Sequence, residues 1–413
     1  MRPIVERLLP ARLGHRFRWL IASSLVTNLG DGFALTAGPL LMASRTHDAS
    51  VVALSLLLQR LPWLLFGGVS GVLADRLDRV VLSVTVELLR AAVLALLVVA
   101  IVTGWAYVET VLAALFLVGT AEVLSGTAIV SILPSLVDRD DIALANSRRL
   151  VGFVTLYQLA GPAIGATLFA AGPALPFGAQ AALVALGAVL MSRIRLPDRG
   201  PAAGGASRLG AEMVDGVRWV ARHAAVRTLV LTTFIFNITF GAAWSVLVLY
   251  AEERLHLGPV GFGVLTAAGA AGGLLGTLGY GWLTRRVSLG NIMRAGLIVE
   301  TFTHFSLAMT TSPVVAAGIM VIFGAHAFVW GSTSVTVRQR AVPEALQGRV
   351  ASVNNTGLFG GLVLGAALGG PIAHRFGVTG PFWFAFAGSA LFVVVMWRQF
   401  AHIAHEDSPV GLD

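Results

Sequence analysis

The chain has 413 residues, of which 56% are hydrophobic and 12% are charged, and its formal net charge is +8. A soluble domain carries about 25% charged residues, so this composition cannot supply a fully water-exposed surface and predicts a protein largely covered by lipid. The chain contains no cysteine, which excludes disulfides, thiol catalysis and cysteine-bound metal.

All 29 basic residues are arginines, since the sequence has no lysine. A Walker A loop uses a lysine to reach nucleotide phosphates, so a standard site of that kind is excluded, as is Schiff-base chemistry. The arginines lie between apolar segments, and membrane orientation explains them better than nucleic acid does. We therefore expect no cofactor, no metal, no nucleotide and no nucleic acid partner.

Twelve apolar segments follow one another along the chain, and a segment needs about 20 mainly apolar residues to cross the bilayer. After an arginine-rich start at residues 1–18, which we interpret as preceding an uncleaved first span, the predicted spans are Trp19–Met42, Val51–Ala74, Val80–Val102, Val108–Leu133, Leu150–Ala171, Leu175–Met191, Thr228–Tyr250, Gly261–Leu283, Asn291–Met309, Val314–Val335, Ser352–Ile372 and Gly380–Trp397.

One connection, residues 193–227, is much longer than the others and is rich in Pro, Gly and Arg. It predicts a cytoplasmic linker between two six-helix bundles, residues 1–192 and 228–413, with a surface helix at Glu212–Arg222. The predicted fold class is therefore an all-α integral membrane protein with 12 transmembrane helices.

The arginines set the predicted orientation. With both termini in the cytoplasm, only Arg45, Arg254 and Arg375 fall in outer loops, while Arg60 and Arg90 lie within spans. This distribution follows the excess of basic residues in cytoplasmic loops of membrane proteins. We expect a multi-pass protein of the inner (plasma) membrane.

The two halves share residues at offsets of 209 or 210. The matches are Asn28 with Asn237, Gly32 with Gly241, Gly71 with Gly281, Pro134 with Pro343, Asn146 with Asn355, and Gly161-Pro162 with Gly370-Pro371. Parallel six-span repeats with a substrate site near the midplane are typical of one class of secondary transporter.

The segment Gly71–Arg79 resembles the signature loop of the major facilitator superfamily, which implies the major facilitator fold and a gating role for Gly71, Asp75, Arg76 and Arg79. We expect Gly71 to permit close helix packing and Asp75 to accept hydrogen bonds from a helix N-terminus. The second-half copy, Gly281–Arg286, lacks the aspartate. The alternative is that these residues are ordinary charges that end a span.

Gly161, Pro162 and Gly165 resemble the glycine–proline motif of antiporters and exporters in this superfamily. Tyr157 and Ala166 depart from the motif, and a kink that serves packing alone is the alternative. Two further segments, Arg338–Val350 and Arg60-Leu61-Pro62, resemble a branch that contains macrolide-efflux and enterobactin-exporter proteins.

An ionisable residue inside a span is by default a functional candidate, because burying a charge in the membrane is costly. Asp31 shares a helical face with Ser24 and Asn28, and we predict that it binds the coupling proton under the influence of Arg60. A permanent ion pair, Asp31–Arg60 or Glu122–Arg60, and direct substrate contact remain the alternatives.

Two further pairs lie one helical turn apart, Glu300 with His304 and His326 with Trp330. The first pair could share a proton and Trp330 could stack on an aromatic substrate, whereas packing is the alternative for both. We interpret Glu87 and Arg90 as gate or interface residues.

Without nucleotide chemistry, an ion gradient is the remaining energy source. The sequence predicts a proton-coupled exporter, an antiporter, that moves an amphipathic organic compound such as a drug, a macrolide or a siderophore by alternating access. Alternatives are an importer or uniporter on the same fold, a membrane enzyme, for which the outer loops lack polar clusters, and a receptor or scaffold that transports nothing.

Overall fold

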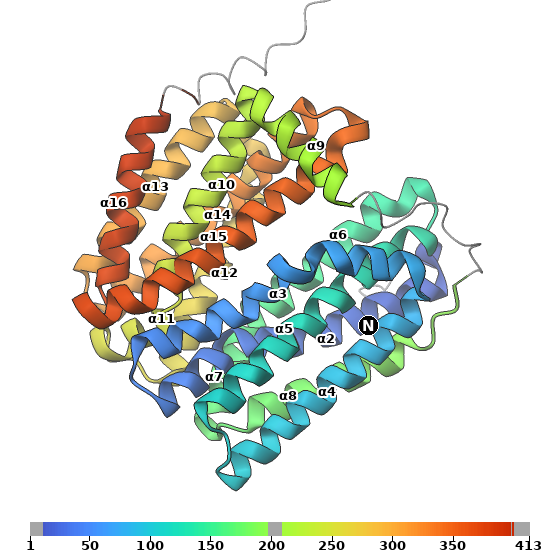
Figure 1. Cartoon of the computed structure of the whole chain (residues 1–413), viewed down its shortest axis with the longest axis horizontal. Coiled ribbons are helices and arrows are strands. Elements are labelled where there is room, and N and C mark those ends of the chain that lie inside the picture. Colours follow the sequence, from blue (N-terminus) through green and yellow to red (C-terminus); the bar gives the residue numbers. More distant parts are fainter. Residues whose placement is uncertain (1–10, 197–208, 398, 400–413) are drawn as a thin grey trace, which may run out of the picture. The chain divides into compact units, whose positions relative to one another are not determined.

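The computed structural model describes residues 11–196, 209–397 and 399, and every regular element in these ranges is helical (Figure 1). The first six spans are α2 (Gly14–Arg45), α3 (Ala49–Arg76), α4 (Arg79–Thr103), α5 (Val108–Ile132), the composite α6 (Ile142–Gly152), η4 (Phe153–Ala160) and α7 (Gly161–Ala171), and α8 (Leu175–Met191).

The second six spans are α10 (Ala224–Trp244), which continues into α11 (Leu247–Leu249) and η6 (Tyr250–Arg254), then α12 (Pro259–Thr284), α13 (Leu289–Met309), α14 (Pro313–Ala341), α15 (Gln347–Phe376) and α16 (Gly380–Met396). Helix α9 (Leu209–Arg222) precedes them and corresponds to the expected surface helix. Short 3₁₀ helices η1 (Ala11–Leu13), η2 (Leu133–Ser135), η3 (Arg139–Asp141) and η7 (Glu344–Leu346) begin or link spans.

The prediction of an all-α membrane fold with twelve spans is confirmed. Within the described residues, eight helices are long and apolar enough to cross a membrane, and α8 and α16 are apolar but shorter. The two remaining spans, α2 and α13, fall outside both groups. They carry the buried acids Asp31 and Glu300, so their polar side chains are covered by neighbouring helices.

The chain forms two compact units. Unit 1 comprises Met1–Thr46 and Leu61–Ala206, and unit 2 comprises His47–Arg60 and Ser207–Asp413. The division falls inside α3, whose first half packs with unit 2 and whose second half packs with unit 1. A Cβ atom on Gly370 of α15 would lie 2.5 Å from the Cα atom of Ser50, so these two backbones touch.

Helix packing repeats between the units. In unit 1, α2 packs on α7 and α8, while α4 packs on α5 and α8. In unit 2, α10 packs on α15 and α16, while α13 packs on α14 and α16. The same order of partners in both units supports an internal six-helix repeat.

The structure corrects the residue correspondence between the repeats. Helices α4 and α13 begin at Arg79 and Leu289, 210 residues apart, but α5 and α14 begin at Val108 and Pro313, 205 residues apart. The offset falls because α4 has 25 residues and α13 has 21. The matches proposed for Asn146 and Gly161-Pro162 at the larger offset are therefore wrong, whereas Pro134 and Pro343 each directly follow the C-cap residue of α5 and α14.

Close glycine contacts show the correct correspondence. A Cβ atom on Gly161 would lie 2.5 Å from the Cα atom of Gly32, and one on Gly365 would lie 2.9 Å from the Cα atom of Gly241. Gly365 in α15, and not Gly370, is thus the structural counterpart of Gly161. Glycine at these positions lets the two backbones approach, as in other membrane helix pairs.

Candidate functional site

Unit 1 holds a buried ion-pair cluster. The Arg90 guanidinium on α4 donates to both carboxylate oxygens of Asp31 on α2, with 3.3 Å from Nη1 to Oδ2 and a shorter contact from Nη2 to Oδ1. Gln180 Nε2 on α8 donates to Asp31 Oδ1 at 3.2 Å. Arg90 Nη1 also lies 3.5 Å from Glu87 Oε2. Asp31 is thereby held by two other helices of its own unit.

The cluster contains more carboxyl groups than guanidinium groups. Asp31, Glu87 and Arg90 are all buried, and Glu122 on α5 is close enough to interact electrostatically with Glu87 and Arg90. If Asp31 and Glu87 were both ionised, the single guanidinium of Arg90 would leave one negative charge in this buried trio, which is costly. Protons on these carboxyl groups would restore neutrality.

The sequence interpretation placed Arg60 beside Asp31 and assigned Arg90 to a gate or interface. The structure gives Asp31 an ion pair with Arg90, while Arg60 is half-buried on the part of α3 that packs with unit 2. In the sequence, the feature that pointed to a charged cluster at Arg90 was its spacing of three residues from Glu87, which places both side chains on one side of the helix. Asn28 is half-buried on α2, one turn before Asp31.

Unit 2 brings the predicted Glu300, His304 and His326 into one cluster. Glu300 Oε1 lies 2.9 Å from His304 Nε2 on the same helix, and Glu300 Oε2 lies 2.9 Å from His326 Nε2 on α14. Glu300 and His304 are fully buried and His326 is half-buried. The two pairs read separately from the sequence thus meet through the packing of α13 on α14.

Aromatic side chains surround this cluster. Phe236, Phe240 and Trp244 follow one another on α10 at four-residue intervals, and each stacks on the next or on a ring of α14. Trp330 stacks on Phe236 at a centroid distance of 6.0 Å, as a consequence of the α10–α14 contact. This α10–α14 aromatic panel offers flat apolar surfaces, the kind of surface on which aromatic ligands pack.

The gating-loop residues lie where α3 ends and α4 begins, and the expectation of close helix packing at Gly71 is wrong. A Cβ atom on Gly71 would meet nothing within 4 Å, so this glycine does not mediate close packing here. The α4 N-terminus is capped by Asp78, whose carboxylate accepts from Val80 and Val81 N–H groups at 2.8 and 3.0 Å. The side chain of Asp75 lies outside the described residues.

The arginines of the gating loop differ in their contacts. Arg79 donates to the Ala74 carbonyl at 2.9 Å and to the Ser131 carbonyl at 2.8 Å, and so joins the ends of α3 and α5. Arg76 is exposed.

The glycine–proline motif follows a π-helical segment, η4. The Gly161 N–H donates to the Leu156 carbonyl five residues earlier, and the next residue, Pro162, has no N–H to donate. Gly161 packs on Gly32, and a Cβ atom on Gly165 would lie 2.6 Å from the Phe33 Cα atom. At this motif, the helix therefore changes from π-helical to α-helical hydrogen bonding and also packs closely on α2.

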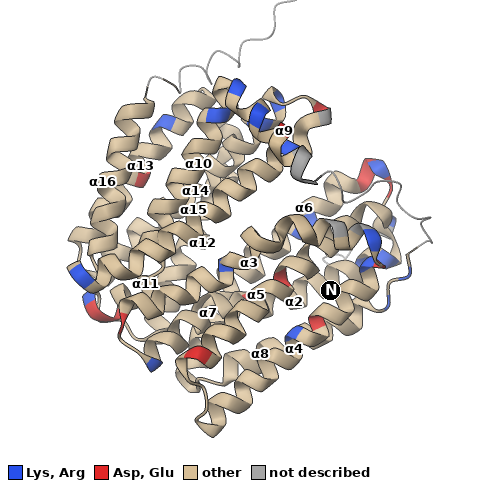
Figure 2. Cartoon of the chain, in the orientation of Figure 1, with Lys and Arg blue, Asp and Glu red and all other residues tan. Residues whose placement is uncertain are grey.

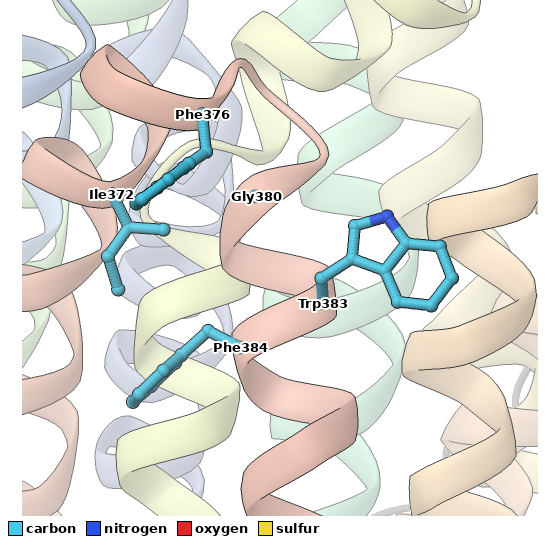
Figure 3. A pocket seen from close by; sticks show the side chains of 5 residues that line it. All are labelled: Ile372, Phe376, Gly380, Trp383 and Phe384. Atoms are coloured by element: carbon cyan, nitrogen blue, oxygen red, sulfur yellow. The ribbon is translucent and has the colours of Figure 1, made fainter.

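An apolar cavity of about 430 Å³ lies where α15 ends and α16 begins (Figure 3). Its lining residues are Ile372, Phe376, Gly380, Trp383 and Phe384. Binding sites for polar organic compounds add a few polar groups to an apolar lining, and this cavity includes no residue of either charged cluster. Figure 2 shows that Arg, Asp and Glu residues gather near helix ends and are sparse along the helices between them.

A family model described as transmembrane secretion effector matches residues 8–409. The chain belongs to this family. It is 28% identical to the multidrug efflux pump Tap of Mycolicibacterium fortuitum, over 88% of this chain and 90% of that protein. It is 22% identical to macrolide efflux protein A of Streptococcus pyogenes, over 86% of this chain and 88% of that protein.

Solved structures agree on the fold. A single-residue mutant of the nucleoside transporter NupG superposes with a TM-score of 0.77 at 12% identity, over 94% of this chain and 100% of that chain. A bacterial homologue of the iron transporter ferroportin in an inward-facing state gives a TM-score of 0.74 at 17% identity, over 94% and 98% of the two chains. The resemblance to the major facilitator superfamily and its macrolide-efflux branch is confirmed: the protein is a multi-pass membrane transporter and not an enzyme.

Proposed function

We propose that the protein exports an amphipathic organic compound, such as a drug or a macrolide, in exchange for protons that enter the cell. The observation that carries this proposal is the buried cluster of Asp31, Glu87 and Arg90, in which acids outnumber the permanent cation. The efflux relatives support the direction and the class of substrate, and the α10–α14 aromatic panel supports an aromatic or apolar cargo.

The cluster suggests how a proton acts on the helices. Asp31 is the member on α2, whereas Glu87 and Arg90 are both on α4. A proton on Asp31 removes the charge that attracts Arg90 to α2, and Arg90 then retains Glu87 on its own helix. Protonation thus weakens the ionic tie between α2 and α4 and biases the protein between two conformations.

The energy is sufficient for this bias. One proton that crosses a potential of 100 mV releases about 2.3 kcal/mol, and about 1.4 kcal/mol already changes an equilibrium tenfold. In this mechanism the two units rock in alternation to open the substrate site to either side, and Asp31 binds its proton from outside and releases it to the cytoplasm.

The test uses purified protein in liposomes with an imposed pH gradient, with ethidium and erythromycin as probes. We expect wild-type protein to move a probe against its gradient and to lose this activity when an uncoupler is added. Asp31→Asn should abolish gradient-driven movement but keep exchange of probe across the membrane.

Four outcomes would overturn the proposal. Gradient-driven export by the Asp31→Asn variant at the wild-type rate would rule out Asp31 as the coupling group. Uptake in the direction of the proton would favour an importer, and probe movement that ignores the gradient would favour a uniporter. No movement of either probe would contradict the proposed class of substrate.

A further inference from the structure

We propose that Glu300, His304 and His326 form a second proton-binding site, contained in unit 2, which takes up one proton separately from the Asp31 cluster. The proton-binding site stands on the geometry of unit 2. Only its consequence for transport, one further proton for each exported molecule, rests on the proposed function.

The hydrogen bonds define the unprotonated site. An ionised carboxylate has only acceptors, so each imidazole nitrogen that lies 2.9 Å from Glu300 donates a proton to it. Both histidines are then neutral with Nε2–H tautomers, and both Nδ1 atoms are the free basic positions. These two Nδ1 atoms are buried and have no hydrogen-bond partner.

The charge of the site is not balanced by neighbouring helices. Two neutral histidines and one carboxylate carry a net charge of −1. On α13 itself, Arg294 lies six residues before Glu300 and donates to the Trp397 carbonyl. On α14 the nearest cation is Arg338, twelve residues after His326.

The arginines on the other elements packed nearby lie at helix ends: Arg254 of η6 donates to the Thr310 and Met309 carbonyls at the end of α13, nine or more residues after Glu300. The only arginine on α10 is Arg227, in the first turn, which donates to the Ala221 carbonyl. Helix α16 has no ionisable residue between Gly380 and Met396, and α12 has only Tyr280, which lies 3.4 Å from Thr336. A proton on one Nδ1 atom is therefore the available way to neutralise Glu300, and it converts one imidazole to imidazolium.

The surrounding rings favour that imidazolium. His326 lies 6.3 Å from Phe236 and 5.8 Å from Phe323, and His304 lies 6.1 Å from Trp244, as ring-centroid distances. All three contacts are edge-to-face, and the His326–Phe323 pair lies within the distance of about 6 Å at which an aromatic ring attracts a cation. The same rings give a carboxylate no stabilisation, so they favour the protonated state of the cluster over the anionic one.

The two clusters occupy equivalent positions in the internal repeat, but their central residues carry opposite charges. Glu300 and Arg90 each lie eleven residues after the first residue of the third span of their unit, Leu289 and Arg79. At equivalent positions, unit 1 has a permanent cation surrounded by acids, and unit 2 has an acid surrounded by two bases. Imidazoles change charge between about pH 5 and 8, so the two sites bind protons through different groups.

Proton binding is measured directly on the purified protein. Histidine labelled with ¹⁵N reports by NMR which imidazole nitrogens carry protons, and His304→Asn and His326→Asn identify the two signals. We expect one imidazolium in the wild-type cluster near neutral pH. In Glu300→Gln, whose amide keeps the shape of the side chain, the protonation midpoint should fall by at least about one pH unit, which is tenfold weaker proton binding.

Asp31→Asn is the matched control and should leave both signals unchanged. Two neutral imidazoles throughout pH 5–8 in the wild-type protein would overturn the proposal. So would an unchanged midpoint in Glu300→Gln, because it would mean that the contacts only join α13 to α14. If Glu300→Gln does not fold, His304→Asn provides a second test, since it should leave His326 as the group that takes the proton.

The transport consequence is measured in liposomes as the largest ethidium gradient sustained at each proton-motive force. The double variant His304→Asn/His326→Asn should lose one proton per cycle. Its largest ethidium gradient should therefore be about tenfold smaller than that of the wild-type protein for each 59 mV of proton-motive force. An unchanged slope would overturn the added stoichiometry. A wild-type gradient that does not depend on the proton-motive force would instead overturn the proposed function and leave the NMR result to decide on the site.

Discussion

Arg90 and Asp31 form the ion pair with the largest expected effect on stability at the scale of single residues. Both side chains are buried, and Arg90 donates to two oxygens of Asp31 while it also faces Glu87. Removal of one member of such a pair leaves a buried charge without a partner, which costs more than removal of both members.

Arg90→Gln should therefore destabilise the folded protein by about 3–5 kcal/mol. The double variant Asp31→Asn/Arg90→Gln, which removes both charges, should recover most of that loss. Thermal unfolding in detergent measures both effects. Equal destabilisation by the single and the double variant would contradict the assignment of Arg90 as the counter-ion of Asp31.

A second residue-scale prediction concerns the start of α4, where Asp78 accepts hydrogen bonds from Val80 and Val81. Loss of a capping side chain costs about 0.5–2 kcal/mol, so Asp78→Ala should lower the unfolding temperature. Asp138 is the matched control, because it precedes η3 without a side-chain capping bond. An equal effect of Asp138→Ala would show that loss of surface charge, and not of the cap, is responsible.

Contacts between pairs of helices depend on glycine at a few positions. Gly161 on α7 lies against Gly32 on α2, and Gly365 on α15 lies against Gly241 on α10. Because a Cβ atom would fall within van der Waals distance of backbone atoms, no rotation of a side chain can relieve the clash. The helices must separate instead.

Gly161→Ala and Gly365→Ala should each destabilise the protein by about 1–3 kcal/mol through overpacking, and each should reduce transport. Gly68→Ala on α3 is the matched control, because a Cβ atom there meets nothing within 4 Å and alanine favours a helix over glycine. Unfolding temperatures of the three variants test this. A loss in Gly68→Ala as large as in the other two would refute the role of close packing.

The whole molecule is a tandem of two six-helix units with a predicted orientation in the membrane. Its absence of cysteine makes single introduced cysteines direct reporters of sidedness. The arginine distribution predicts that the loop between α2 and α3 faces outward and that the segment after α8 faces the cytoplasm.

In intact cells, a membrane-impermeant maleimide should therefore label His47→Cys and should not label Ser192→Cys until the membrane is opened. Both wild-type side chains are exposed, so accessibility within the protein does not distinguish them. Reversed labelling would place the termini outside and contradict the predicted orientation.

The sequence by itself determined the number of spans, the membrane location and the family, because apolar length and the signature loop are local properties of the chain. It also predicted that Asp31, Glu300, His304 and His326 lie inside spans, since an ionisable group within an apolar run is conspicuous. Depth along a helix was the only coordinate available for these residues, and it does not say which side chains face each other.

The tertiary structure decided the partners and the register. Packing of both α2 and α4 on α8 brought Arg90 to Asp31, and packing of α14 on α13 joined His326 to Glu300. It also replaced Gly370 by Gly365 as the counterpart of Gly161, because α4 is longer than α13 by about one turn. Contacts between helices depend on the rotation of each helix about its axis and on its length. A match of residue types at a fixed offset carries no information about either property.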